Sequence, residues 1–157
     1  MTGRVAARLA ELDITLPDVA APVAAYVPAV RSGIHVLTSG QLPFVDGVLP
    51  ATGKVGTGPD DVSPARAAEL ARVAALNAVA AVRSLVGDLD TVVRVVKVVG
   101  FVASRPEFTG QPAVINGAST VLGEIFGDAG VHARSAVGVA VLPLDSPVEV
   151  EIMVEVG

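Results

Sequence analysis

The sequence predicts an α+β fold in which one mixed sheet of about six strands carries two main helices on one face. The strand and helix patterns follow one another in the order hairpin, strand, helix, long strand, helix, hairpin. Only two long helical patterns occur, and they are too few to cover both faces of a sheet. The chain has 157 residues and a similar apolar pattern along its whole length. It is therefore expected to form a single domain, residues 1–157, with enough length to bury a core.

The composition limits the classes of protein that fit this chain. Hydrophobic residues make up 52%, yet no run reaches the ~18–20 uninterrupted apolar residues of a membrane helix. We therefore expect the excess apolar surface to meet another subunit. The net charge of −5 leaves no basic face for nucleic acid, and the absence of cysteine excludes disulfides and thiol nucleophiles. The N-terminus lacks the apolar segment of a signal peptide, so a cytoplasmic location is expected.

Residues 1–20 are expected to form a helical extension and part of a linker. Val5, Leu9 and Leu12 recur at the spacing of one helix face, and prolines bound the linker at residues 16–22. The extension is expected to pack on its own subunit or on a neighbour.

Two strands and a short hairpin are expected next. The apolar residues 23–30 and 34–39 predict strands that are joined by a turn at residues 31–33. The segment 44–49 has an Asp-Gly pair at its centre, which is typical of a tight hairpin turn.

Both main helices have sequence signals at their ends. Ser63 and the proline after it predict an N-cap and a first helical residue, and this helix is expected to run to about Val86 and end at Gly87. Residues 112–126 predict the second helix, which is again followed by a glycine. Between the helices, the valine-rich residues 91–102 predict a buried strand.

The C-terminal residues 133–156 predict two strands whose side chains sort by parity. The prolines of residues 143–147 bracket the loop between them, because proline cannot donate to a ladder. A hairpin that matches the valines on one face would place Arg134 and three glutamates on the other face, where we expect the function to lie. That face would also carry the small residues Ala136, Gly138 and Ala140.

Several motifs of this chain occur in the same order in a known family. They are RSAV at residues 134–137, LP at 142–143 and VEVE at 148–151, preceded by APVAAY at 21–26 and TSGQLP at 38–43. Together they resemble the motifs of the RidA (YjgF) family of reactive enamine and imine deaminases, whose members are also labelled L-PSP endoribonucleases.

The resemblance implies a chorismate-mutase-like fold and a homotrimer with ligand pockets between subunits. It also implies hydrolysis of small 2-imino or 2-enamino acids to 2-keto acids, with no cofactor and no metal. The partner would be a small carboxylate, not nucleic acid or a membrane. The family's functional residues map onto Tyr26, Ser39, Gly40, Asn116, Arg134 and Glu149. Arg134 and Glu149 would be catalytic, and the other four would bind substrate.

The chain also departs from the family pattern. Val27-Pro28 replaces the polar pair that usually follows the tyrosine, and Ala136 stands where the family has a cysteine. The loss of the cysteine, the N-terminal extension and a loop before Asn116 that is longer than in the short members suggest a divergent branch.

The residue types support this chemistry. The planar fork of an arginine can hold a carboxylate through two parallel hydrogen bonds, and a glutamate can activate water or move a proton. A glycine after a strand, as at Gly40, lets a ligand approach the backbone closely. His35 and His132 are not in metal-ligand spacing, and both are expected to be structural.

Other interpretations remain open. A salt bridge at a strand end would explain Arg134, and a solvated strand face would explain the glutamates. An isolated tyrosine such as Tyr26 is more often a packing residue, and a helical asparagine such as Asn116 is more often solvated. A non-catalytic carboxylate binder is therefore an alternative to the deaminase. Ribonuclease activity is disfavoured by the acidic charge and by the aromatic content of 3%.

The predicted hairpin has a consequence for the site. With Val139 opposite Ile152, Arg134 and Glu149 of one chain are about eight residues apart along the ladder, or roughly 25 Å at ~3.3 Å per residue. Side chains do not span that distance. If both residues serve one site, as the resemblance implies, they must come from different subunits.

Overall fold

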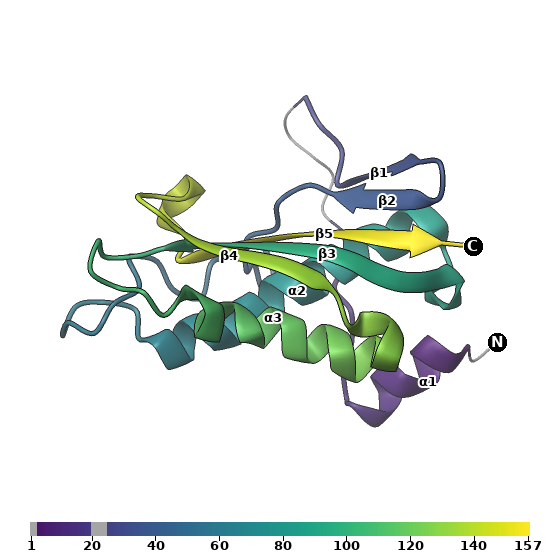
Figure 1. Ribbon diagram of the computed structural model, residues 1–157, viewed down its shortest axis with the longest axis horizontal. Coiled ribbons are helices and arrows are strands. Elements are labelled where there is room, and N and C mark those ends of the chain that lie inside the picture. The colour runs from purple at the N-terminus through teal and green to yellow at the C-terminus, as the bar shows by residue number, and fades with distance from the viewer. Residues whose placement is uncertain (1–2, 20–24) are drawn as a thin grey trace.

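The computed structural model describes residues 3–19 and 25–157, which form a five-stranded sheet and three α-helices (Figure 1). In chain order the elements are α1 (Arg4–Glu11), β1 (Ala29–Ser32), β2 (His35–Thr38), α2 (Pro64–Val86), β3 (Val92–Ala103), α3 (Gln111–Phe126), β4 (Ala133–Val139) and β5 (Val148–Val156). The strand order is β1-β2-β5-β3-β4, in which only β3 and β4 are parallel. α2 and α3 lie side by side on one face, as predicted.

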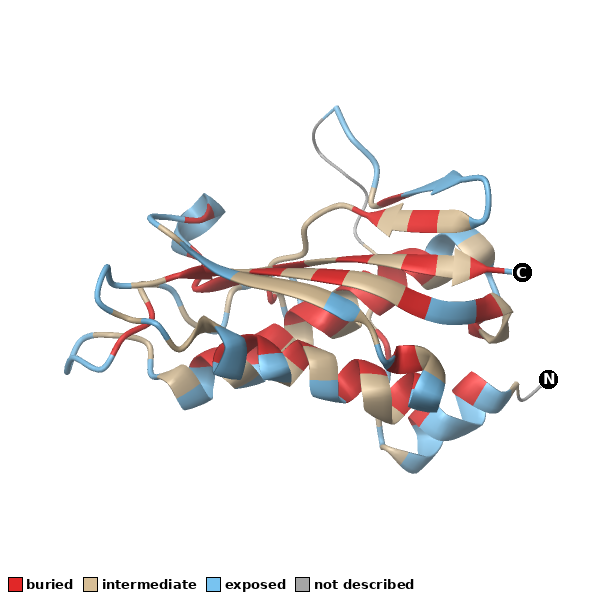
Figure 2. Cartoon of the chain, viewed as in Figure 1, coloured by how far each residue is buried: buried red, intermediate tan, exposed pale blue. Residues whose placement is uncertain are grey.

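The core lies between the sheet and these two helices (Figure 2). In β5 the apolar residues at every second position are buried, with exposed fractions of 0–3%, and the residues between them are half-buried. α2 contributes mainly alanines to the core, whereas Leu85 near its end is 44% exposed. Within the described residues, no helix combines the length and apolarity that a membrane crossing requires.

α2 and α3 begin and end close to the predicted positions. Ser63 Oγ accepts a hydrogen bond of 3.1 Å from the backbone N–H of Arg66, and Pro64 is the first helical residue. Gly87, with φ of 78°, ends α2, and Gly127, with φ of 61°, ends α3. Both φ values lie in the left-handed region that glycine adopts without strain.

α1 is attached to the rest of the chain through its first turn. The Asp90 carboxylate accepts hydrogen bonds from the backbone N–H groups of Arg4 and Val5, both at 2.7 Å. Such N–H groups have no partner inside a helix, so the carboxylate satisfies them and complements the positive end of the helix dipole. Val5 and Leu9 are buried in the core. The predicted helical extension therefore packs on its own subunit.

The first hairpin differs from the prediction. The turn was predicted at residues 31–33, but the register of β1 and β2 places it at Gly33-Ile34, one position later. The strand predicted at residues 23–30 lies partly outside the described residues, and β1 itself begins only at Ala29.

The predicted Asp46-Gly47 turn forms, but it adds no strand to the sheet. Asp46 has φ of 50° and Gly47 has φ of 79°, as a two-residue hairpin turn with two left-handed positions requires. Val45 and Val48 exchange two backbone hydrogen bonds of 2.9 and 3.0 Å as an isolated bridge. The sheet therefore has five strands instead of about six.

The two C-terminal strands do not form the predicted hairpin, because β3 lies between them. Val98 of β3 is the partner of Arg134 in β4 and also of Ile152 in β5. Residues 140–147 cross over the end of β3 instead of making a tight turn. The predicted pairing of Val139 with Ile152 is therefore wrong.

The small residues of β4 face the helices, and not the open side of the sheet as predicted. Ala136 packs against the core. A Cβ atom at Gly138 would lie 2.8 Å from Nε2 of Gln111 and 2.9 Å from Oγ of Ser104. Small side chains are needed here because α3 and the loop before it come close to the strand.

Candidate functional site

Arg134 is held against α3 by hydrogen bonds to two neutral side chains. Its Nη1 donates to Asn116 Oδ1 at 2.7 Å and to Ser119 Oγ at 3.2 Å. Asn116 and Ser119 are three residues apart on α3, so both side chains lie on the same helix face. Within residues 3–19 and 25–157, no carboxylate forms a salt bridge with Arg134. Within one chain, Arg134 is therefore not half of a strand-end salt bridge.

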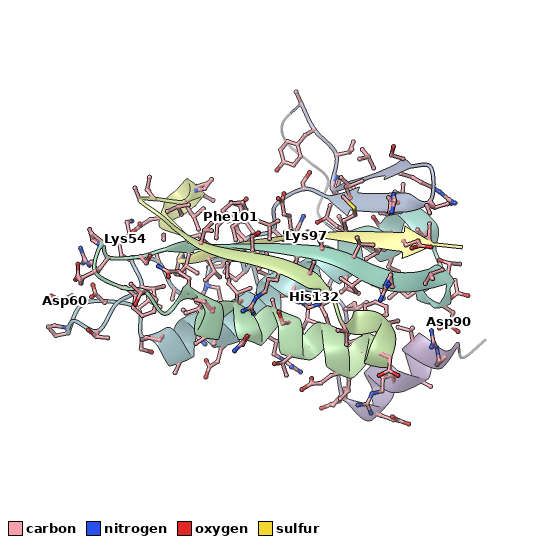
Figure 3. All side chains as sticks on the ribbon, viewed as in Figure 1. Lys54, Asp60, Asp90, Lys97, Phe101 and His132 are labelled. Carbon is pink, nitrogen blue, oxygen red and sulfur yellow. The ribbon has the colours of Figure 1, made fainter. Side chains whose placement is uncertain are left out.

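The hydrogen-bonded cluster continues from Ser119 to His132. Ser119 Oγ lies 2.9 Å from Nε2 of His132, and Nδ1 of that imidazole lies 2.6 Å from the carbonyl oxygen of Gly130. His132 is seen between β4 and α3 in Figure 3. From the sequence, His132 was expected to be structural, and no motif pointed to Ser119. The spacing of Asn116 and Ser119 on one helix face was the available signal for Ser119.

Glu149 lies on the opposite face of the sheet, which we call the open face. Its members include Lys97, Val99 and Phe101 of β3, Ser135 and Val137 of β4, and Glu149, Glu151, Met153 and Glu155 of β5. Arg94 of β3 and His35 and Leu37 of β2 share this face as register partners of Glu155 and Met153. Figure 3 shows Phe101 and Lys97 on this side, away from α3. Burial raises the pKa of the Glu149 carboxyl, and the nearby charge of Glu151 raises that pKa further.

The TSGQLP motif runs beside β5 and brings Gly40 against Glu149. Gln41 and Val150 exchange backbone hydrogen bonds of 2.8 and 3.0 Å, which fix the segment along the strand. A Cβ at Gly40 would collide with the Glu149 carboxylate, lying 2.8 Å from Cδ and 3.1 Å from Cγ. The absence of a side chain at Gly40 therefore gives the carboxylate its position.

Ser39 and Tyr26 lie at the edge of this region. Ser39 Oγ donates to the carbonyl oxygen of Val27 at 2.7 Å, and its backbone N–H donates to Pro28 at 2.8 Å. These bonds tie the motif to the segment that carries Tyr26, whose side chain is 58% exposed. Residues 21–24 of the APVAAY motif lie outside the described residues.

The structure brings the predicted site residues together in two groups. Asn116 and Arg134 form one group with Ser119 and His132, which we call the arginine cluster. Gly40 and Glu149 form the core of the other group, which also includes Ser39 and which we call the glutamate group.

The two groups do not meet within one chain. Register partners on neighbouring strands share a face, so Arg134 points with Val98 and Ile152 toward the helices. Glu149, the partner of Phe101, points away from them. Their backbones are two strands apart, at ~4.8 Å per strand, and about three residues apart along the strands, at ~3.3 Å each. The predicted 25 Å separation was too long, but the sheet itself now separates the two side chains.

Two hollows of the chain lie elsewhere. One, of about 340 Å³, is lined by residues of α1 and the end of α2, and another, of about 570 Å³, lies between α1 and the end of α3. Neither is lined by Arg134 or Glu149. Among the described residues, no three histidine, aspartate or glutamate side chains are grouped as a metal site would require.

Comparison with known proteins gives consistent matches along almost the whole chain. A family model described as "YjgF/chorismate_mutase-like, putative endoribonuclease" matches residues 6–156. Protein TCP17 of Trypanosoma cruzi is 47% identical over 157 residues, which cover 99% of this chain and 96% of the relative.

Solved structures agree with these sequence matches. Atu1372 of Agrobacterium tumefaciens is 43% identical and has a TM-score of 0.88, with 98% of this chain and 93% of that chain covered. The structure of Escherichia coli TdcF with bound serine is 26% identical and has a TM-score of 0.62, with 91% and 96% covered.

Proposed function

The chain belongs to the YjgF/chorismate mutase-like family, and from that premise we propose that it hydrolyses small 2-imino and 2-enamino acids to 2-keto acids. The observation that carries this proposal is the state of Arg134. Its guanidinium is held in place by two neutral side chains, Asn116 and Ser119, and no salt bridge within the described residues neutralises it. An arginine in this state is suited to bind a carboxylate in a bidentate manner.

In the proposed reaction Arg134 anchors the carboxylate of the substrate and Glu149 handles the proton. The ionised Glu149 takes a proton from a water molecule, whose oxygen adds to the C2 carbon of the imine. The same carboxyl returns that proton to the nitrogen, which gives a carbinolamine. The carboxylate then takes the proton of the new hydroxyl and passes it to the nitrogen, so that the C=O bond forms, the C–N bond breaks, and ammonia and the 2-keto acid are released. The raised pKa of Glu149 suits this role, because a base works best when its pKa lies near the working pH.

Tyr26, Ser39, Gly40 and Asn116 are proposed to position the substrate. Gly40 leaves space beside the Glu149 carboxylate, and the exposed Tyr26 ring can close over a small ligand. Positioning by these groups can supply much of the rate enhancement, because hydrolysis of an imine is an intrinsically easy reaction.

We propose that the complete site is shared between subunits of a homotrimer, in the cytoplasm. The arginine cluster and the glutamate group lie on opposite faces of one sheet, so one chain alone does not assemble them. β4 is an edge strand that carries Arg134, and Val137 on its open-face side is 44% exposed. An open face that includes Phe101, Val99 and Met153 is suited to contact with another copy of the chain.

A second candidate function is binding of a small amino or keto acid without catalysis. It is favoured by the bound serine in the structure of TdcF. The same Arg134 fork would hold the carboxylate in this case, and Glu149 would have no proton to transfer.

One assay separates the two functions. Imines are generated in situ from a panel of L-amino acids by an amino-acid oxidase with catalase, and release of the 2-keto acid is timed with and without the protein. Faster release that depends on Arg134 and Glu149 supports the deaminase. Binding of pyruvate or serine without acceleration for any imine of the panel would support the binder instead. Retention of RNA on filters at physiological salt would contradict both.

A further inference from the structure

We propose that Ser119 and His132 are positioning residues that fix the Arg134 guanidinium so that its Nε–H and Nη2–H groups face an incoming carboxylate. The inference rests on the proposed function, because it describes how the same site holds its ligand. Neither residue is among those to which the family resemblance assigns a role.

The hydrogen-bond directions in this cluster follow from the chemistry of its ends. The carbonyl of Gly130 can only accept, so Nδ1 of His132 carries a proton and donates to it at 2.6 Å. In the neutral imidazole Nε2 is then an acceptor, and the Ser119 hydroxyl donates its proton to it at 2.9 Å. The Ser119 oxygen is left with lone pairs, and it accepts from Arg134 at 3.2 Å.

This arrangement fixes which edge of the guanidinium remains available. Nη1 has two N–H groups, and they are directed to Asn116 and Ser119. The Nε–H and one Nη2–H form a parallel pair on the other edge, with the spacing of two carboxylate oxygens. The carboxylate is therefore expected to bind side-on through Nε and Nη2.

His132 and Ser119 each affect this geometry in a distinct way. Without its partner at His132, the Ser119 hydroxyl would be free to rotate and to direct its proton toward the arginine. Without Ser119, Nη1 would keep only Asn116, and the guanidinium could turn about that single bond. In both cases the guanidinium would be less ordered before the carboxylate binds. Ordering it on binding would then cost conformational entropy and weaken the affinity.

The experiment measures binding of pyruvate by calorimetry to the wild type and to Ser119→Ala, His132→Ala and His132→Gln. We expect Ser119→Ala and His132→Ala to weaken pyruvate binding about 3- to 10-fold, as the loss of one neutral hydrogen bond implies. His132→Gln should restore most of the affinity, because the glutamine carbonyl can accept from Ser119 near the position of Nε2. The double variant Ser119→Ala/His132→Ala should bind no more weakly than the weaker single variant. Thr120→Ala, the exposed neighbour on α3, is the matched control and should bind as the wild type does.

Three further measurements distinguish positioning from a general structural role. In imine hydrolysis the single variants should raise KM by the same factor with little change in kcat, because the carboxylate is held equally in the ground and transition states. Binding of pyruvamide, which has no carboxylate charge, should not change. Nitrogen NMR of His132 at pH 8 should show the neutral form protonated at Nδ1.

Arg134→Ala separates failure of this inference from failure of the proposed function. If Arg134→Ala loses pyruvate binding while Ser119→Ala and His132→Ala bind as the wild type does, Ser119 and His132 do not position the guanidinium. Arg134 would still be the anchor of the carboxylate. If Arg134→Ala binds pyruvate as the wild type does, the proposed function fails. Protonation of His132 at Nε2, or equal losses of affinity for pyruvate and pyruvamide in the variants, would contradict the positioning role of Ser119 and His132.

Discussion

The arginine cluster and the glutamate group are held by different physical means. Arg134 is held by side chains, through hydrogen bonds of 2.7 and 3.2 Å to residues of α3. Glu149 is placed by the backbone, because the Gln41–Val150 pairing brings a glycine against its carboxylate. The arginine is therefore sensitive to the loss of polar atoms, whereas the glutamate is sensitive to the addition of carbon atoms.

The two groups also differ in charge and in solvation. The arginine keeps its charge and is surrounded by neutral acceptors that orient it. The glutamate is partly buried next to Glu151, so its ionised form is disfavoured. One group supplies a fixed binding partner, and the other supplies a carboxyl whose protonation state can change during a reaction.

The largest effect is expected for Glu149→Gln. The amide keeps the shape of the side chain but cannot take a proton, so kcat for imine hydrolysis should fall by about 10²- to 10⁴-fold. Binding of pyruvate should stay within a few-fold of the wild type. A variant that keeps more than half of the wild-type kcat would show that Glu149 is not the base.

Arg134→Lys is expected to have the next largest effect. A lysine keeps the positive charge but cannot make two parallel hydrogen bonds, so pyruvate binding should weaken roughly 10- to 100-fold. The melting temperature should change little, because Arg134 is half-buried and not part of the apolar core. Equal affinity of the two proteins for pyruvate, measured by calorimetry, would show that Arg134 does not anchor the carboxylate.

Gly40→Ala tests whether space beside Glu149 is needed. The new Cβ would displace the carboxylate, which is the flexible end of its side chain, so the fold should survive while kcat falls about tenfold. Gly123→Ala on α3 is the matched control, because nothing lies within 4 Å of its Cβ position. The control should keep full activity and gain about 0.5–1 kcal/mol of stability from helix propensity. Equal activity of the two variants would show that Gly40 does not position the carboxylate.

The raised pKa of Glu149 predicts opposite pH effects on activity and stability. A general base must be ionised, so kcat should fall with decreasing pH through a pKa above the usual glutamate range. Because the folded pKa is higher than the unfolded one, the folded state binds more protons between the two values, and its stability falls as pH rises through that window. In Glu149→Gln this part of the pH dependence of the free energy of unfolding should disappear. Identical profiles for the two proteins in urea titrations would contradict the assignment.

Much of the fold was predictable because it depends on local patterns. The helix caps at Ser63, Gly87 and Gly127, and the alternation in β5, depend only on residues that are close together in the sequence. The strand order was not predictable in this way. β4 and β5 show the same alternation whether they pair with each other or with β3, since each arrangement buries the same valines of β5.

The site was predictable to a similar degree. The sequence motifs pointed to Arg134, Asn116, Gly40 and Glu149, and the structure brings these residues together in two pairs. The error in strand order put Arg134 on the wrong face. The contact between His132 and Ser119 was not predicted, because the two residues are 13 positions apart on different elements.

The most direct test of the central claim, that the site is shared between subunits, is a mixing experiment. Inactive Arg134→Ala and Glu149→Gln proteins are denatured together in equal amounts, refolded and assayed for imine hydrolysis, with each variant refolded alone as the control. In randomly mixed trimers about a quarter of the sites should combine an intact Arg134 of one subunit with an intact Glu149 of its neighbour, and activity should return to that level. If sedimentation shows trimers of the expected mass but the mixture stays as inactive as the separate variants, the two residues do not form a site between subunits.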